Sequence, residues 1–117
     1  MYIVPNIVDV KPLENYCIYL KFENGEEKVY DVKREINTIK FYDKLKDKTY
    51  FKNVKTMGDT VVWKNGEDIA PENLYYESIT LDEYKKNNSI WYIVILFILE
   101  SLVRNLIKYW KTKINIV

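Results

Sequence analysis

The stretch F-E-N-G-E at residues 22–26 decides the fold, because it closes a β-hairpin between two strand-like segments. Asn-Gly tolerates positive φ at both central residues of a type I′ turn, a common tight connection between antiparallel strands. A second stretch of this kind, W-K-N-G-E at residues 63–67, follows another strand-like segment. The returning strand is less clear there, so the second turn is the weaker signal. The pairs expected to make these turns are Asn24-Gly25 and Asn65-Gly66.

Strand-like alternation extends from the first turn in both directions. Apolar residues at every second position over residues 16–22 share one face of a strand, and residues 27–32 resume the alternation. Residues 7–13 predict a further strand, with a turn marked by Pro12. The sequence therefore predicts a three-stranded antiparallel meander with one apolar face, which needs a cover.

A helix over residues 36–45 is the predicted cover, since its apolar residues recur at helical spacing among charged ones. Asn37 or Thr38 is expected to cap the N-terminus of this helix. Pro71 predicts the start of a second, short helix, where the missing N–H of proline costs nothing.

Residues 54–63 predict a second β-hairpin. Trp63, at its end, is expected to pack across the hairpin on Val54 or on the covering helix; an exposed partner anchor is the less favoured alternative. The predicted fold class is α+β: the meander and second hairpin pack on a short helix, followed by a C-terminal hydrophobic helix.

Length, charge and composition exclude several classes of function. The 117 residues suit one small domain, and the net charge of +1 gives no global attraction to nucleic acid. The chain has no histidine, which removes the commonest general base and zinc ligand. Its one cysteine, Cys17, excludes an internal disulfide and is expected to be a small core residue. We expect no metal, no cofactor and no small-molecule substrate.

Three acidic residues stand in motif-like positions, and none is expected to be catalytic. Asp31 is expected to cap the turn into the segment that follows it. Asp68 is expected to organise the loop before Pro71 through Asx-type hydrogen bonds. With Glu72, these residues could form an acid–base pair only in a suitable cleft, and the structural interpretation is favoured.

A basic cluster lies between residues 44 and 55 and could contact phosphates. Asp43 and Asp47 interleave with its lysines, however, and no arginine accompanies them, so a solvated helix face is favoured. The lysines are Lys44, Lys46, Lys48, Lys52 and Lys55.

The order of the motifs resembles a small bacterial family, the domain of unknown function 2442. The resemblance covers about residues 3–77, from V-K-P-L at residues 10–13, through the two Asn-Gly stretches, to D-I-A-P-E-N-L-Y at residues 68–75. It implies a compact bacterial or phage α+β domain with no established activity. Some members carry a helix-turn-helix or sit beside toxin-like partners, which implies regulation or partner binding. Beyond Tyr76 this chain has no helix-turn-helix pattern.

The chain is expected to divide into an α+β domain at residues 1–84 and a hydrophobic helical tail at residues 85–117. Residues 90–99 form an unbroken apolar run, and Glu100 and Arg104 then interrupt it. Residues 90–107 are predicted to form one helix with its apolar side buried. The residues expected to form an interaction surface are Ile90, Trp91, Ile95, Leu99, Leu102 and Leu106.

Three interpretations of the tail remain open. It could be a partner or self-association helix, a membrane helix over about residues 90–110, or a tail without a selected function. Lysines and aromatic residues flank the apolar run on both sides, as in membrane helices. The N-terminus has no signal-peptide pattern, so the cytoplasm is the expected compartment, with membrane association as the alternative.

The sequence thus favours a non-enzymatic domain that binds a protein partner, as an antitoxin-like or regulatory accessory. The alternatives are a DNA-associated regulator and a membrane-tethered module. DNA binding would have to weaken steeply as salt rises.

Overall fold

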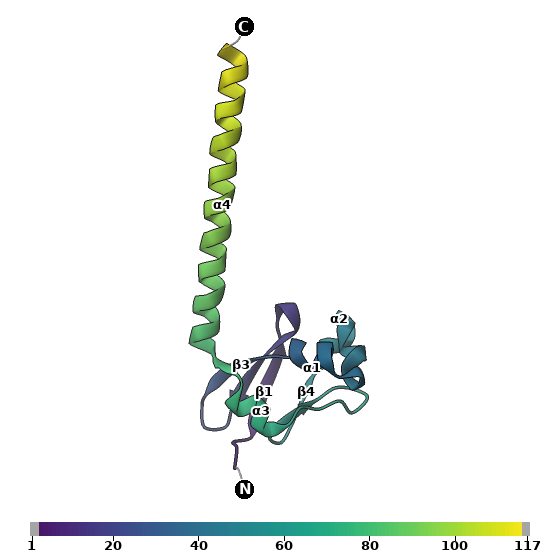
Figure 1. Ribbon diagram of the computed structural model, residues 1–117. Helices are drawn as coiled ribbons and strands as arrows, with labels where there is room; N and C mark the ends of the chain where they lie inside the picture. The colour runs from purple at the N-terminus through teal and green to yellow at the C-terminus, as the bar shows by residue number, and fades with distance from the viewer. Residues whose placement is uncertain (1–2, 116–117) are drawn as a thin grey trace. The chain divides into compact units, whose positions relative to one another are not determined.

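The computed structural model describes residues 3–115 and divides the chain into two compact units, Met1–Glu83 and Tyr84–Val117. Residues 1, 2, 116 and 117, at the ends of the two expected domains, lie outside the described residues. Figure 1 shows the elements, which are β1 (Ile7–Pro12), η1 (Glu14–Tyr16), β2 (Cys17–Phe22), β3 (Glu27–Asp31), α1 (Lys33–Thr38), η2 (Lys40–Lys46), α2 (Lys48–Phe51), β4 (Lys55–Met57), β5 (Thr60–Val62), α3 (Pro71–Tyr76), β6 (Ile79–Thr80) and α4 (Leu81–Asn115).

The main sheet has four antiparallel strands in the order β1-β2-β3-β6, which confirms the predicted meander and the α+β class. The second hairpin, β4–β5, is also confirmed, and it lies against β1, where Ile7 N–H donates to Gly58 O at 2.8 Å. The sequence did not predict β6, which pairs with Lys28 and Val29 of β3.

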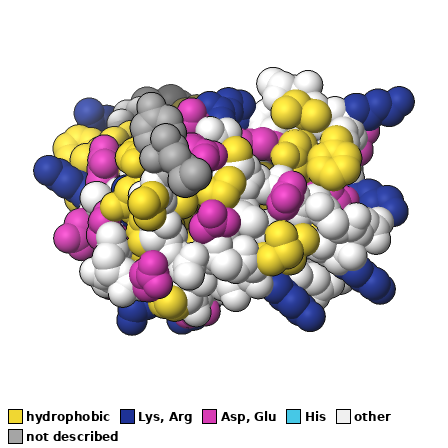
Figure 2. Space-filling view, turned by 90° about the horizontal axis from the view of Figure 1, so that it is seen from below, with side chains coloured by type: hydrophobic (Ala, Val, Ile, Leu, Met, Phe, Trp, Pro, Cys, Tyr) yellow, Lys and Arg dark blue, Asp and Glu magenta, His cyan; other side chains and the backbone are white. Residues whose placement is uncertain are grey.

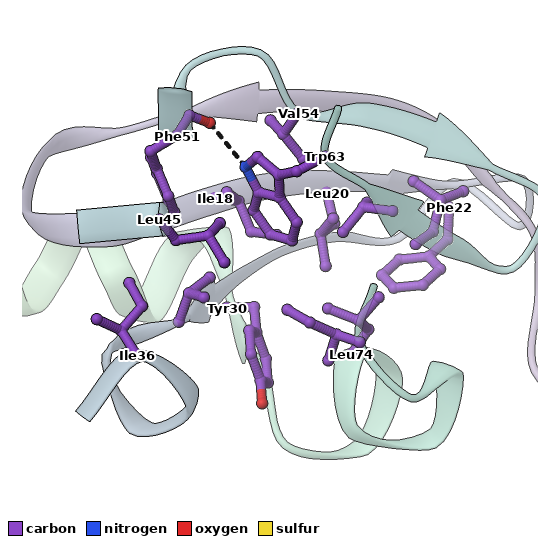
Figure 3. Packing of buried hydrophobic residues seen from close by; sticks show 14 residues of the cluster. Ile18, Leu20, Phe22, Tyr30, Ile36, Leu45, Phe51, Val54, Trp63 and Leu74 are labelled. Carbon is purple, nitrogen blue, oxygen red and sulfur yellow. Dashed lines mark hydrogen bonds between the residues drawn. The ribbon is translucent and has the colours of Figure 1, made fainter. Parts of the chain in front are cut away.

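The core lies between one face of the main sheet and the elements that cover it. Ile18, Leu20 and Phe22 of β2 are almost fully buried there. Figure 3 shows Trp63 among these residues, with its indole N–H donating to Phe51 O at 2.9 Å. Val54 belongs to the same cluster, so the expected burial of Trp63 in the hairpin core is confirmed.

The two Asn-Gly turns are not the predicted type I′ turns. Positive φ occurs at Gly25 (89°) and Gly66 (96°), but not at Asn24 or Asn65. In the first loop, Gly25 N–H donates to Phe22 O at 2.9 Å and Phe22 N–H to Glu26 O at 2.9 Å. This is a three-residue hairpin loop, a type I turn followed by a bulge with glycine in the left-handed region. Trp63 and Gly66 make the equivalent bonds in the second loop, at 2.9 Å each.

The predicted covering helix over residues 36–45 is wrong in its bounds. Two shorter elements replace it: α1 begins earlier, at Lys33, and η2 follows after a break at Ile39, whose φ of −126° and ψ of 116° are extended. Neither Asn37 nor Thr38 is an N-cap, because both lie inside α1, where the Thr38 hydroxyl donates to Arg34 O at 2.5 Å. The run of polar and β-branched residues around the break has low helix propensity.

Two further short helices complete the cover. Asp47 caps α2, accepting the backbone N–H of Thr49 at 2.9 Å, and the helix buries Phe51. Pro71 is the first residue of α3, as predicted, and Leu74 of that helix is fully buried.

Candidate functional site

Both Asn-Gly loops are braced by a tyrosine hydroxyl that donates to the glutamate after the glycine. In the first loop, Tyr75 of α3 donates to Glu26 Oε1 at 2.5 Å, and Asn24 Nδ2 donates to the same oxygen at 2.7 Å. The Lys28 ammonium lies 3.6 Å from Glu26 Oε2 and 4.3 Å from the centre of the Tyr75 ring. The pKa of Glu26 is lowered, mainly by the hydrogen bond from Tyr75. This carboxyl is therefore suited to carry a negative charge at neutral pH and not to act as a proton donor.

The second loop repeats the arrangement with a different helix. Tyr50 of α2 donates to Glu67 Oε1 at 2.6 Å, and its oxygen accepts the Asn65 backbone N–H at 2.9 Å. Glu67 is only 3% exposed. The sequence analysis selected Asn65 and Gly66 as turn residues but assigned no role to Glu67. The repeated string Asn-Gly-Glu was a signal that could have identified this glutamate.

Two of the three acids singled out in the sequence, Asp31 and Asp68, bond through or to the backbone. Asp31 Oδ1 accepts the Lys33 N–H at 2.9 Å, where α1 begins, so its expected capping role is confirmed. For Asp68 the expected Asx-type bonding is not what organises the loop. Its backbone pairs with Val62 in an isolated bridge, and its carbonyl accepts the Tyr42 hydroxyl at 2.7 Å.

A buried carboxylate that the sequence did not reveal lies at the start of α1. Glu35 is 5% exposed, and its Oε1 accepts the hydroxyl of Tyr30. Arg34 Nη2 lies 3.6 Å from Glu35 Oε1 and 2.5 Å from Glu77 Oε2. Among the described residues, Glu35 Oε2 has no hydrogen-bond partner. Burial is the largest cause that raises the pKa of Tyr30, followed by this hydrogen bond.

We expect Tyr30→Phe to destabilise the domain by about 1–3 kcal/mol, because it leaves the buried Glu35 carboxylate without its hydroxyl donor. Urea unfolding followed by circular dichroism measures the change. Tyr92→Phe is the matched control, since Tyr92 is 64% exposed on α4. Equal stabilities of the two variants would contradict a structural role for the Tyr30–Glu35 bond.

Tyrosine pKa values predict a domain that is sensitive to alkali. The hydrogen bond to Glu27 is the main cause that raises the pKa of Tyr19 to about 12. Burial is the largest cause of the raised pKa of Tyr30, Tyr42 and Tyr50, and the hydrogen bond to Glu26 is the largest for Tyr75.

Above a pH of about 10 the unfolded chain loses tyrosine protons that the folded domain retains, so the free energy of unfolding falls as pH rises. The free energy of unfolding should not depend on these tyrosines below about pH 10 and should decline between about pH 10 and 12. Urea unfolding at several pH values measures this, and Tyr19→Phe should remove part of the decline. Stability that stays constant through this range would refute the assignment.

The basic cluster spans η2, α2 and the start of β4. Lys46 Nζ lies 3.2 Å from Asp43 Oδ1, so the lysines share this surface with acidic residues. Figure 2 shows one face of the molecule, on which basic and acidic side chains are both scattered among apolar and uncharged ones. In the described part of the chain, no group of three or more His, Cys, Asp or Glu could hold a metal ion.

The second unit is dominated by α4, one continuous helix of 35 residues (Figure 1), which confirms a single helix across residues 90–107. By length and composition it could cross a membrane: an 18-residue window has a mean hydropathy of 1.9 and at most two charged residues. This is the one such helix in the described residues.

Within the chain itself, none of the apolar window of this helix is buried. The expected burial of one side against a partner or a membrane stays a prediction. The residues of the predicted interaction surface are all about half exposed or more: Ile90 51%, Trp91 67%, Ile95 52%, Leu99 51%, Leu102 59% and Leu106 57%. Apolar residues occur all round the helix from residue 90 to residue 99, so this part of the helix has no separate polar side.

The fold and these clusters define a small α+β domain with two tyrosine-braced hairpin loops, followed by a long apolar helix. The family described as "Protein of unknown function (DUF2442)" matches residues 7–80, and the chain belongs to this family. This confirms the resemblance identified from the motifs. No match was found among curated proteins or among solved structures. The family match ends at Thr80, so α4 lies beyond it.

Proposed function

We propose that this protein is a non-enzymatic accessory module that α4 anchors in a membrane, while the α+β domain binds a protein partner. The observation that carries the proposal is the apolar window of α4, none of which is buried within the chain. An apolar surface of this length needs a cover, and either a lipid bilayer or other protein could supply it.

The dimensions of α4 support a membrane as the cover. At 1.5 Å per residue, Trp91 and Trp110 are about 28 Å apart along the axis, close to the roughly 30 Å of a hydrocarbon core. Tyr92 and Tyr109 adjoin these tryptophans, so an aromatic pair stands at each end of the window. Such pairs are typical of the two interfaces of a membrane helix. Lysines follow outside both pairs: Lys85 and Lys86 on one side, Lys111 and Lys113 on the other.

The free energy of insertion is a balance of two terms of similar size. The Leu, Ile, Val and Phe residues between positions 90 and 107 together contribute about −4 to −7 kcal/mol on an insertion scale. Glu100 and Arg104 cost about 2.5–3.5 kcal/mol each at the centre of a helix. The stability of the inserted helix therefore depends on whether polar groups in the membrane interact with Glu100 and Arg104 and lower this cost.

Surface composition supports a partner-binding role for the domain. Several large apolar side chains lie on its surface, and the chain has neither histidine nor a glycine-rich phosphate loop. The exposed residues include Val8, Ile39, Phe41, Met57 and Tyr76.

Fractionation of the full-length chain and of a chain lacking residues 89–117 tests the anchor. We expect the full-length chain to pellet with membranes, to resist high salt and to be released by detergent. The truncated chain should stay in the supernatant with the circular dichroism spectrum of a folded α+β domain. A full-length chain that forms a soluble dimer, and becomes monomeric on truncation, would instead place α4 against protein in water.

A further inference from the structure

Glu100 and Arg104 are the two charged residues within residues 90–107, and both are exposed. Neither forms an ion pair with any described residue. Glu100 lies almost midway between Trp91 and Trp110, about 14 Å along the axis from each. Its short side chain cannot reach either interface from that depth, whereas a long Lys or Arg side chain near the end of a helix can.

Successive residues of an α-helix are 100° apart, which sorts polar and apolar residues between positions 95 and 108 onto two opposite faces. One face, here called the polar stripe, consists of Glu100, Ser101, Arg104 and Lys108. The opposite face, here called the apolar seam, consists of Ile95, Leu99, Leu102 and Leu106, the core of the interaction surface expected from the sequence. Two copies of α4 could therefore pair through either face.

The solvent decides which face is covered. In water, two helices bury their most apolar faces, and the charges stay outside. In a bilayer the apolar seam is already well solvated by lipid, whereas charged side chains face the interior of a bundle and pair there. A membrane-inserted α4 should therefore reverse the arrangement expected for a soluble dimer.

We propose that, in the membrane, α4 pairs with α4 of a second copy in parallel through the polar stripe. The Arg104 side chain of each copy then reaches toward Glu100 of the other. The inference rests on the proposed membrane anchor.

A second copy is the occupant because the polar stripe is complementary to itself. A two-fold axis along the helix pair keeps each residue at the depth of its equivalent, so Glu100 of one helix and Arg104 of the other differ in depth by about 6 Å. The long arginine side chain leans toward the N-terminus of its helix and can span this offset, and the two-fold axis makes the pairing occur twice. The charge of the buried pair sums to zero, and Ser101 adds a hydroxyl that can donate between the helices. A single orientation in the membrane makes the pair parallel.

Cysteine cross-linking in lipid vesicles separates the two faces. Ser101→Cys changes one atom on the polar stripe, and Leu99→Cys lies two residues away at nearly the same depth, about 160° round the helix. We expect oxidation to give a disulfide-linked dimer with Ser101→Cys and little with Leu99→Cys. The unmodified chain is the background, because its one cysteine, Cys17, is buried in the domain.

Charge variants in the Ser101→Cys chain test the pairing itself. Glu100→Gln should lower the dimer yield about three- to tenfold, the range expected for interhelical polar contacts in membranes. E100K should lower it further, and the double exchange E100K/R104E should restore it, because opposite charges meet again. Glu83→Gln, in the first turn of α4 and outside the window, is the matched control.

The outcomes distinguish this inference from the proposed function. Membrane fractionation of the same preparations reports the anchor independently of cross-linking. A membrane-bound chain that cross-links through Leu99→Cys, or through neither position, overturns the pairing and leaves the anchor intact. A chain that remains in the supernatant overturns both. A double exchange that fails to restore dimers, while single variants remain inserted, also overturns the pairing.

Discussion

Trp63→Ala should unfold most of the domain, with a loss of about 3–5 kcal/mol, the cost of removing a buried tryptophan side chain. Trp63 is 2% exposed, and the centres of the Trp63 and Phe51 rings are 5.8 Å apart within the core that Figure 3 shows. The loss also removes the donor to the Phe51 carbonyl. Urea unfolding followed by far-ultraviolet circular dichroism measures the effect, because the variant lacks the one tryptophan of the domain, and Trp91 and Trp110 on α4 would dominate its fluorescence.

Two further variants separate packing from hydrogen bonding at this position. Trp63→Phe keeps an aromatic ring but removes the indole N–H, and should cost about 1–3 kcal/mol from the unpaired carbonyl, in addition to the smaller ring volume. Trp91→Ala, at a 67% exposed position on α4, should change the stability of the domain by less than about 0.5 kcal/mol. Similar losses from Trp63→Ala and Trp91→Ala would contradict the core assigned here.

Ile95→Lys should release the protein from membranes. The substitution replaces a favourable residue by a charged one deep in the window, at a cost of about 3–4 kcal/mol on an insertion scale. Because each 1.4 kcal/mol is a factor of ten, the membrane-bound fraction relative to the soluble fraction should fall by roughly 100-fold or more. Carbonate extraction and quantitative blotting of both fractions measure the ratio.

Two other Ile→Lys variants serve as controls for this effect. Ile107→Lys lies near the end of the window, where lysine can reach the interface, so its effect should be clearly smaller. Ile3→Lys is a charge-matched control in the domain, at an 88% exposed position, and should have no effect on the ratio. Three variants with equal membrane fractions would show that insertion does not hold the protein there.

The sequence predicted elements whose pattern repeats over several residues. The alternation in β2 placed Ile18, Leu20 and Phe22 on one buried face, and the apolar run after residue 89 predicted one long helix. Pro71 gave the start of α3, because proline is restricted to few positions in a helix. These features can be recognised in the sequence because each depends on local backbone geometry or on a pattern of burial that extends along a whole element.

The parts that were missed depend on contacts between distant residues. β6 has only two residues, too few for a period, and exists because it pairs with β3. Buried Glu35 accepts a hydrogen bond from the hydroxyl of Tyr30, on the other side of the turn between β3 and α1. Glu67 likewise accepts a hydrogen bond from Tyr50 of α2. The turn type also escaped prediction, because Asn-Gly suits both a type I′ turn and a loop with positive φ at glycine alone.

Both edges of the main sheet are poor templates for strand addition. At one edge, β6 offers only two residues, and at the other, β1 is interrupted by a bulge near Asp9 and ends in Pro12, which has no N–H. The β4–β5 hairpin also occupies Ile7 N–H on that edge. Many copies of the domain held by anchors in one plane would meet at high local concentration. The short and interrupted edges would then protect them against edge-to-edge aggregation.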